Sequence, residues 1–158
     1  MTGGTGRLAL WQRNVIGAAV AAVALGVIIP FDLWPQWADY RATVEPAHVI
    51  EPRESLAVDG QTWSVADVRH LRREPRPGAP ALPEGTVLTE VTVDRAGVVP
   101  PDTYVIGVLT DGQQRWRGES LAPTQGQLAW NFVVPDDAVP TALDITMLDG
   151  SIPIRLQL

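Results

Sequence analysis

The chain has 158 residues, enough for one domain of about 100 to 150 residues and a short additional segment. Cysteine is absent, which excludes disulfide bonds, thiolate metal sites and a cysteine nucleophile. The net charge of −6 argues against broad nucleic-acid binding, and the use of arginine without lysine is typical of a GC-rich bacterial genome.

The first predicted element is a membrane-spanning helix at residues 14–31. Residues 15–29 carry no charge, and the predicted span approaches the length of about 20 residues that crosses the hydrocarbon layer. Trp11 precedes it, and Trp34 and Trp37 follow it, as expected for the two headgroup layers. A buried helix would show a polar face, and a cleaved signal peptide would show a pair of small residues after the apolar run. The sequence shows neither feature. We therefore favour an uncleaved signal anchor over both alternatives.

The charges that flank the apolar run predict its orientation. Arg7 and Arg13 precede it, whereas Asp32 is the first charged residue after it, so the N-terminus is expected in the cytoplasm. This predicts a single-pass protein of the plasma membrane. Its parts are a cytoplasmic tail (1–13), the transmembrane helix (14–31), a juxtamembrane linker (32–42) and an extracytoplasmic domain (43–158).

The predicted helix also carries a stripe of small residues at a spacing of four. The stripe consists of Asn14, Ala18, Ala22 and Gly26. Small residues on one helix face allow another transmembrane helix to approach closely. The stripe is either a packing face or a chance result of a composition rich in Ala and Gly.

Alternation of apolar and polar residues dominates the rest of the chain and predicts half-buried β-strands. The alternating apolar sets are Val87, Val91 and Val93; Tyr104, Ile106 and Val108; Leu128, Trp130, Phe132 and Val134; Leu143, Ile145 and Met147; and Ile152, Ile154, Leu156 and Leu158. Two further strands are expected at 43–50 and 54–58. We expect Trp63, Trp116 and Trp130 to fill the core instead of stacking on a sugar ligand.

Asp-Gly dipeptides separate several of these runs and predict hairpins with type I′ turns. They are Asp59-Gly60, Asp111-Gly112 and Asp149-Gly150, and residues 94–97 (DRAG) predict a fourth turn. Seven to nine strands separated by turns indicate an all-β fold, an immunoglobulin-like antiparallel β-sandwich.

The order of these features resembles telokin-like immunoglobulin-type extracellular domains. The matching segments are 58–65 (VDGQTWSV), 109–112 (LTDG) and 132–136 (FVVPD). With 10–17 (LWQRNVIG) included, the whole chain is similar to a group of actinobacterial single-pass membrane proteins without assigned function. The resemblance implies the fold and the location, and it implies no catalytic residues.

No catalytic or metal-binding pattern is found in the sequence. None of its serines has the flanking glycines of a nucleophile elbow, and His48 and His70 lie in unrelated contexts. Asp136 and Asp137 stand between two prolines and predict a turn. We therefore expect a protein that is not an enzyme and needs no cofactor.

One basic segment interrupts the acidic domain. Residues 69–76 contain Arg69, Arg72, Arg73 and Arg76, and prolines follow at 77, 80 and 83. A stiff, projecting loop of this kind presents guanidinium groups to anionic headgroups, an envelope polyanion or an acidic protein. Alternatively, these arginines pair with carboxylates of the domain itself. Arg115 and Arg117 extend the patch if the fold brings them near.

The sequence thus favours a membrane-tethered, non-catalytic interaction module of the cell envelope. Its expected partners are the lipid bilayer, through residues 14–31, and another membrane or envelope protein. An accessory subunit that joins a larger membrane complex through its transmembrane helix is the alternative.

Overall fold

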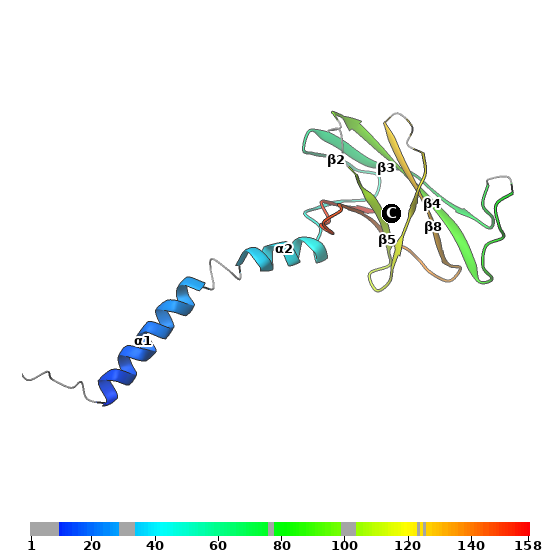
Figure 1. Cartoon of the computed structure of the whole chain (residues 1–158). Coiled ribbons are helices and arrows are strands. Elements are labelled where there is room, and N and C mark those ends of the chain that lie inside the picture. The colour runs from blue at the N-terminus through cyan, green and yellow to red at the C-terminus, as the bar shows by residue number, and fades with distance from the viewer. Residues whose placement is uncertain (1–9, 29–33, 76–77, 99–103, 123, 125) are drawn as a thin grey trace, which may run out of the picture. The chain divides into compact units, whose positions relative to one another are not determined.

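The structure is a computed structural model, and it describes all residues except 1–9, 29–33, 76–77, 99–103, 123 and 125. The chain divides into two compact units, Met1–Arg41 and Ala42–Leu158. Each unit is described by itself (Figure 1).

The described residues of the first unit are helical. Helix α1 spans Leu10–Ile28, and helix α2 spans Trp34–Val44 and continues into the second unit. Pro35 lies in the first turn of α2, where the missing N–H of proline costs no hydrogen bond. On α2 the rings of Trp37 and Tyr40 lie 5.8 Å apart. This second helix was not predicted, and the strand expected at 43–50 is wrong for Thr43 and Val44, which are helical.

The second unit is a β-sandwich of two five-stranded sheets. The first sheet has the order β1-β10-β9-β5-β6, and the second has the order β2-β3-β4-β8-β7. The strands are β1 (His48–Ile50), β2 (Ser55–Val58), β3 (Gln61–Leu71), β4 (Thr86–Gly97), β5 (Ile106–Thr110), β6 (Arg115–Arg117), β7 (Glu119–Ser120), β8 (Gln127–Pro135), β9 (Ala142–Thr146) and β10 (Ile154–Gln157). The all-β sandwich is confirmed, but it is not purely antiparallel as predicted, because β1 pairs with β10 in parallel. The ten strands of the described residues exceed the seven to nine that were predicted, because the chain changes sheets at Gly118 and thereby forms two short strands, β6 and β7.

The sandwich buries a continuous apolar core between its sheets. The alternating residues of β8 and β9 contribute to it, and Trp130, Phe132 and Leu143 are at most 1% exposed. Trp63 is buried in the same core, and the half-buried Trp116 packs against it. The prediction that three tryptophans fill the core is therefore confirmed.

Of the three Asp-Gly dipeptides, Asp59-Gly60 forms the predicted type I′ turn, whereas the prediction is wrong for Asp111-Gly112 and Asp149-Gly150, where only the glycine has a positive φ. Asp59 and Gly60 have positive φ values of 50° and 75° and join β2 to β3 as a two-residue hairpin, as predicted. The loop at Asp111 is longer, because its carboxylate accepts hydrogen bonds from the N–H groups of Gln114 (2.7 Å) and Gln113 (2.8 Å). These hydrogen bonds lower the pKa of Asp111. Asp149 similarly accepts two hydrogen bonds from Ser151 within the connection from β9 to β10.

The predicted turn at residues 94–97 is wrong. These residues continue β4 and pair with β3 from Asp94 opposite Ser64 to Gly97 opposite Gln61. Long-range pairing with β3 outweighs the local preference of Asp and Gly for turns. As a result, Arg95 points inward and is buried.

The inward face of β5 also differs from the prediction. Gly107 and Leu109 face the core, whereas Ile106 and Val108 are only half-buried. A Cβ atom at Gly107 would lie 2.7 Å from the ring of Trp130, so the tryptophan fills the space that a side chain of β5 would otherwise occupy. A glycine was therefore missed as an inward position because it contributes no apolar side chain to the pattern.

Candidate functional site

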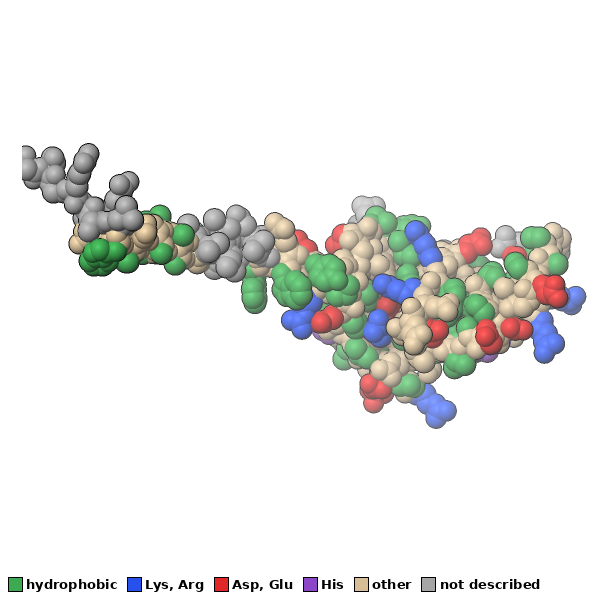
Figure 2. Space-filling view, turned by 90° about the horizontal axis from the view of Figure 1, so that it is seen from below, with side chains coloured by type: hydrophobic (Ala, Val, Ile, Leu, Met, Phe, Trp, Pro, Cys, Tyr) green, Lys and Arg blue, Asp and Glu red, His purple; other side chains and the backbone are tan. Residues whose placement is uncertain are grey.

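Helix α1 presents its apolar side chains on its surface (Figure 2). Val20 is 63% exposed and Val23 is 68% exposed. Among the described residues, the structure contains no helix whose length and apolar character suffice to span a membrane. Residues 29–31 of the predicted span lie outside the described residues.

The small residues Asn14, Ala18, Ala22 and Gly26 all belong to α1, and all four are exposed. A Cβ atom at Gly26 would meet no atom within 4 Å. The stripe is therefore an open surface of the helix.

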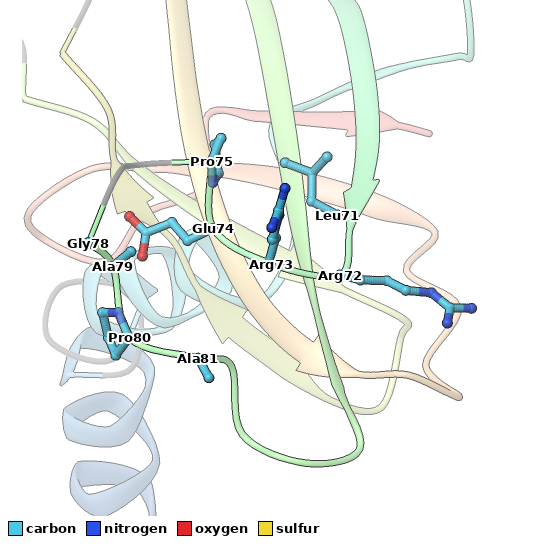
Figure 3. Close-up of a pocket in the computed structure, with 9 residues that line it drawn as sticks. All are labelled: Leu71, Arg72, Arg73, Glu74, Pro75, Gly78, Ala79, Pro80 and Ala81. Atoms are coloured by element: carbon cyan, nitrogen blue, oxygen red, sulfur yellow. The ribbon is translucent and has the colours of Figure 1, made fainter.

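The basic segment forms the end of β3 and a loop that curves back toward β4 (Figure 3). A hollow of about 940 Å³ lies along its described part, and its lining residues are Leu71, Arg72, Arg73, Glu74, Pro75, Gly78, Ala79, Pro80 and Ala81. In Figure 3 the side chain of Arg72 points away from this hollow, whereas Glu74 extends into it toward Gly78.

The four candidate arginines have different environments. Arg69 lies on β3, and its Nε donates a hydrogen bond to Asp67 Oδ2 over 2.5 Å. Arg72 and Arg73 are exposed, and neither has a carboxylate partner among the described residues. Arg76 lies outside the described residues. The candidate contact surface therefore reduces to the guanidinium groups of Arg72 and Arg73, which we call the arginine pair.

Arg115 and Arg117 belong to the other sheet, and Arg115 takes part in a separate charged cluster. Arg155 Nε donates to Asp144 Oδ1 over 2.6 Å, and its Nη2 donates to Oδ2 over 2.9 Å. Arg115 Nη2 reaches the same Oδ2 over 3.4 Å. Hydrogen bonding to the Asp144 carboxylate raises the pKa of Arg155. Asp144 lies on the face of its sheet that points away from the core, and its side chain is nevertheless completely buried. We therefore assign this cluster a structural role.

A buried arginine, Arg95, was missed in the sequence. It lies on the same face of β4 as Val91 and Val93, which are both fully buried. The spacing of two residues from Val91 to Val93 to Arg95 was a usable signal, because side chains two residues apart on a strand share one face. The assignment of a turn to 94–97 concealed it.

The remaining titratable candidates have ordinary structural positions. His48 and His70 are exposed, and His70 Nδ1 lies 3.0 Å from Thr89 Oγ1. Asp136 and Asp137 form the predicted turn after β8. Within the described residues, no group of three or more His, Asp or Glu side chains is arranged to hold a metal ion.

Comparison with known proteins gives one similar structure. No protein-family model matches the chain, and no curated protein matches it. Among solved structures, an uncharacterised β-sandwich protein from Clostridium difficile 630 is similar, with a TM-score of 0.41 and 8% sequence identity. The similarity covers 72% of this chain and 95% of that protein.

Proposed function

We propose that this protein is a non-catalytic interaction module of the cell envelope, tethered to the plasma membrane by residues 14–31. The observation that carries the proposal is the exposure of apolar side chains on α1, in a chain whose β-sandwich buries its own core. A helix that is apolar on all faces requires a nonpolar environment, which a bilayer supplies. The N-terminus is then cytoplasmic and the β-sandwich extracytoplasmic, as the flanking charges favour.

Aspartate substitutions in α1 are expected to release the full-length protein from membranes. The eight Val, Ile and Leu residues of 15–29 contribute about −4 kcal/mol to insertion, and two aspartates in place of Val20 and Val23 add about +6 kcal/mol. The Val20→Asp/Val23→Asp variant should therefore appear in the supernatant after alkaline extraction of membranes, whereas the unmodified chain remains in the pellet.

The matched control places the same two changes on the β-sandwich. Val98 is 83% exposed and Val139 is 74% exposed, so Val98→Asp/Val139→Asp adds equal charge without affecting insertion. This variant should stay in the pellet. Extraction of the unmodified protein, or retention of the α1 variant, would contradict the tether.

The arginine pair supports the second part of the proposal, which is contact with an acidic face of another envelope protein. Both side chains are exposed, lack a carboxylate partner among the described residues and belong to a proline-rich segment. A stiff loop loses little conformational entropy when it binds, and arginine forms paired hydrogen bonds with carboxylates.

Charge removal at the arginine pair is expected to reduce partner capture about tenfold. Arg72→Gln/Arg73→Gln should weaken crosslinking of the full-length protein in native membranes, and added salt should weaken capture by the unmodified protein. The control is Arg53→Gln/Arg117→Gln, which removes two exposed charges from other parts of the surface. Equal capture by both variants would reject the arginine pair as the contact.

A second candidate function, an accessory subunit recruited through α1, has the exposed small-residue stripe in its favour. In that case Ala22→Leu/Gly26→Leu releases the protein from a complex in mild detergent while leaving it in the membrane.

A further inference from the structure

A second site lies between the two sheets of the β-sandwich, and none of its lining residues belongs to the arginine pair. It is a cavity of about 240 Å³ behind the hairpin that joins β2 to β3. One wall carries Trp63 and Arg95, and the opposite wall carries Ile145 and Ile154. All four side chains are less than 9% exposed, so the cavity extends into the protein interior.

The unusual group in this cavity is the guanidinium of Arg95. The residue is 6% exposed, and its Nη2 atom is buried without a hydrogen-bond partner. No carboxylate among the described residues forms an ion pair with it. Burial lowers the pKa of Arg95. A buried cation without a counter-charge is unfavourable for the empty protein, and an anion in the cavity removes that cost.

Neighbouring residues hold the guanidinium in place. Arg95 Nε donates to Gln61 Oε1 over 2.7 Å, and Gln61 Nε2 donates to the carbonyl of Val98 over 3.1 Å. The guanidinium carbon lies 4.9 Å from the centre of the Trp63 ring. This hydrogen bond and this stacking leave Nη2 as an oriented donor, which is the preorganisation expected of a binding group.

We propose that this cavity binds a small monocarboxylate with an apolar body. Its carboxylate accepts a hydrogen bond from Arg95 Nη2, and its hydrocarbon part packs against Ile145 and Ile154. The volume corresponds to about eight water molecules at about 30 Å³ each, which suits an aromatic or short branched acid and is too small to enclose a long acyl chain.

The surroundings favour a monocarboxylate over a phosphate or sulfate. Most of the lining is apolar, and the unpaired donor that it offers belongs to one side chain. A doubly charged anion needs several donors to replace its hydration. Asp59, an exposed residue at the edge of the cavity, adds a negative charge that opposes multiply charged ligands.

The test is a calorimetric titration of the full-length protein with benzoate, together with measurement of the thermal unfolding midpoint with and without benzoate. Benzamide, a neutral molecule of nearly the same shape, is the matched control ligand. Benzoate is expected to bind at least tenfold more tightly than benzamide and to raise the midpoint. Equal affinities for the two, or binding of laurate without binding of benzoate, would overturn the proposal.

Two variants locate the site. Arg95→Gln should abolish the preference for benzoate over benzamide, whereas Arg117→Gln, an exposed arginine of β6, should leave it unchanged. If Arg95→Gln does not fold, Met147→Trp fills the cavity from its half-buried lining while retaining Arg95. Benzoate binding that survives both substitutions would place the acid elsewhere.

A third variant distinguishes an external acid from an internal carboxylate. Asp102 lies outside the described residues and follows β4 in the sequence. Asp102→Asn is expected to leave the benzoate affinity unchanged. A tenfold gain would instead identify Asp102 as the natural counter-charge of Arg95 and would reject an external ligand.

Discussion

Replacement of Arg155 by methionine is expected to lower the free energy of unfolding of the β-sandwich by about 3 to 5 kcal/mol. The change removes both short hydrogen bonds to Asp144 and leaves a carboxylate that is 0% exposed. Arg115 does not compensate, because its single contact spans 3.4 Å and its side chain is 47% exposed. Urea unfolding of the full-length protein, followed by tryptophan fluorescence, measures the loss.

Two further variants determine whether the buried carboxylate is the cause. Arg115→Met should cost less than about 1 kcal/mol, as is usual for an exposed ion pair. Asp144→Leu combined with Arg155→Met should recover most of the stability, because no buried charge then lacks a partner. Equal losses for Arg115→Met and Arg155→Met would show that burial of Asp144 does not decide the energetics.

Substitution of Gly107 by valine is expected to destabilise the sandwich by about 3 kcal/mol. The new Cβ atom would meet the Trp130 ring at 2.7 Å, and that ring is 1% exposed, so it has no free space into which to move. Ala96→Val, at an exposed position of β4, adds two methyl groups and should change stability by less than about 0.5 kcal/mol.

A double-mutant cycle tests whether the Trp130 ring is the obstacle. Trp130→Leu alone is expected to cost about 2 to 4 kcal/mol through the cavity that it leaves. The double variant with Gly107→Val should lose less than the sum of the single losses, by about 1 to 3 kcal/mol, because the valine fills part of that cavity. Additive losses would show that the two residues act independently.

Local chemistry was sufficient to predict the parts of the fold that depend on neighbouring residues. The hairpin at Asp59 requires positive φ at two successive positions, and Asp-Gly supplies them at low cost. The buried side of β8 follows from alternation, because each inward residue is large and apolar. These features do not depend on which strand lies opposite.

The errors arose where distant segments decide the outcome. Residues 94–97 contain turn formers but extend β4 through pairing with β3. Gly107 is an inward position of β5 only because Trp130 of the other sheet occupies the space above it. Neither partner can be identified from a single sequence without knowledge of the sheet order.

The same distinction applies to the candidate sites. Composition alone predicted the exposed loop that carries Arg72 and Arg73. The pairing of Arg69 with Asp67 was also accessible, because residues two apart on a strand share a face. The cavity at Arg95 was not accessible, since its walls come from strands of both sheets.

The parallel pairing of β1 with β10 has a mechanical consequence if the domain is tethered as we propose. His48 lies opposite Ile154 and Ile50 opposite Leu156, and the N–H of Ala47 donates to the carbonyl of Ile152 over 2.9 Å. A pulling force that enters from the N-terminal side acts along the axis of β1. It therefore loads these hydrogen bonds together in shear, and the domain resists tension better than it would if they opened one after another.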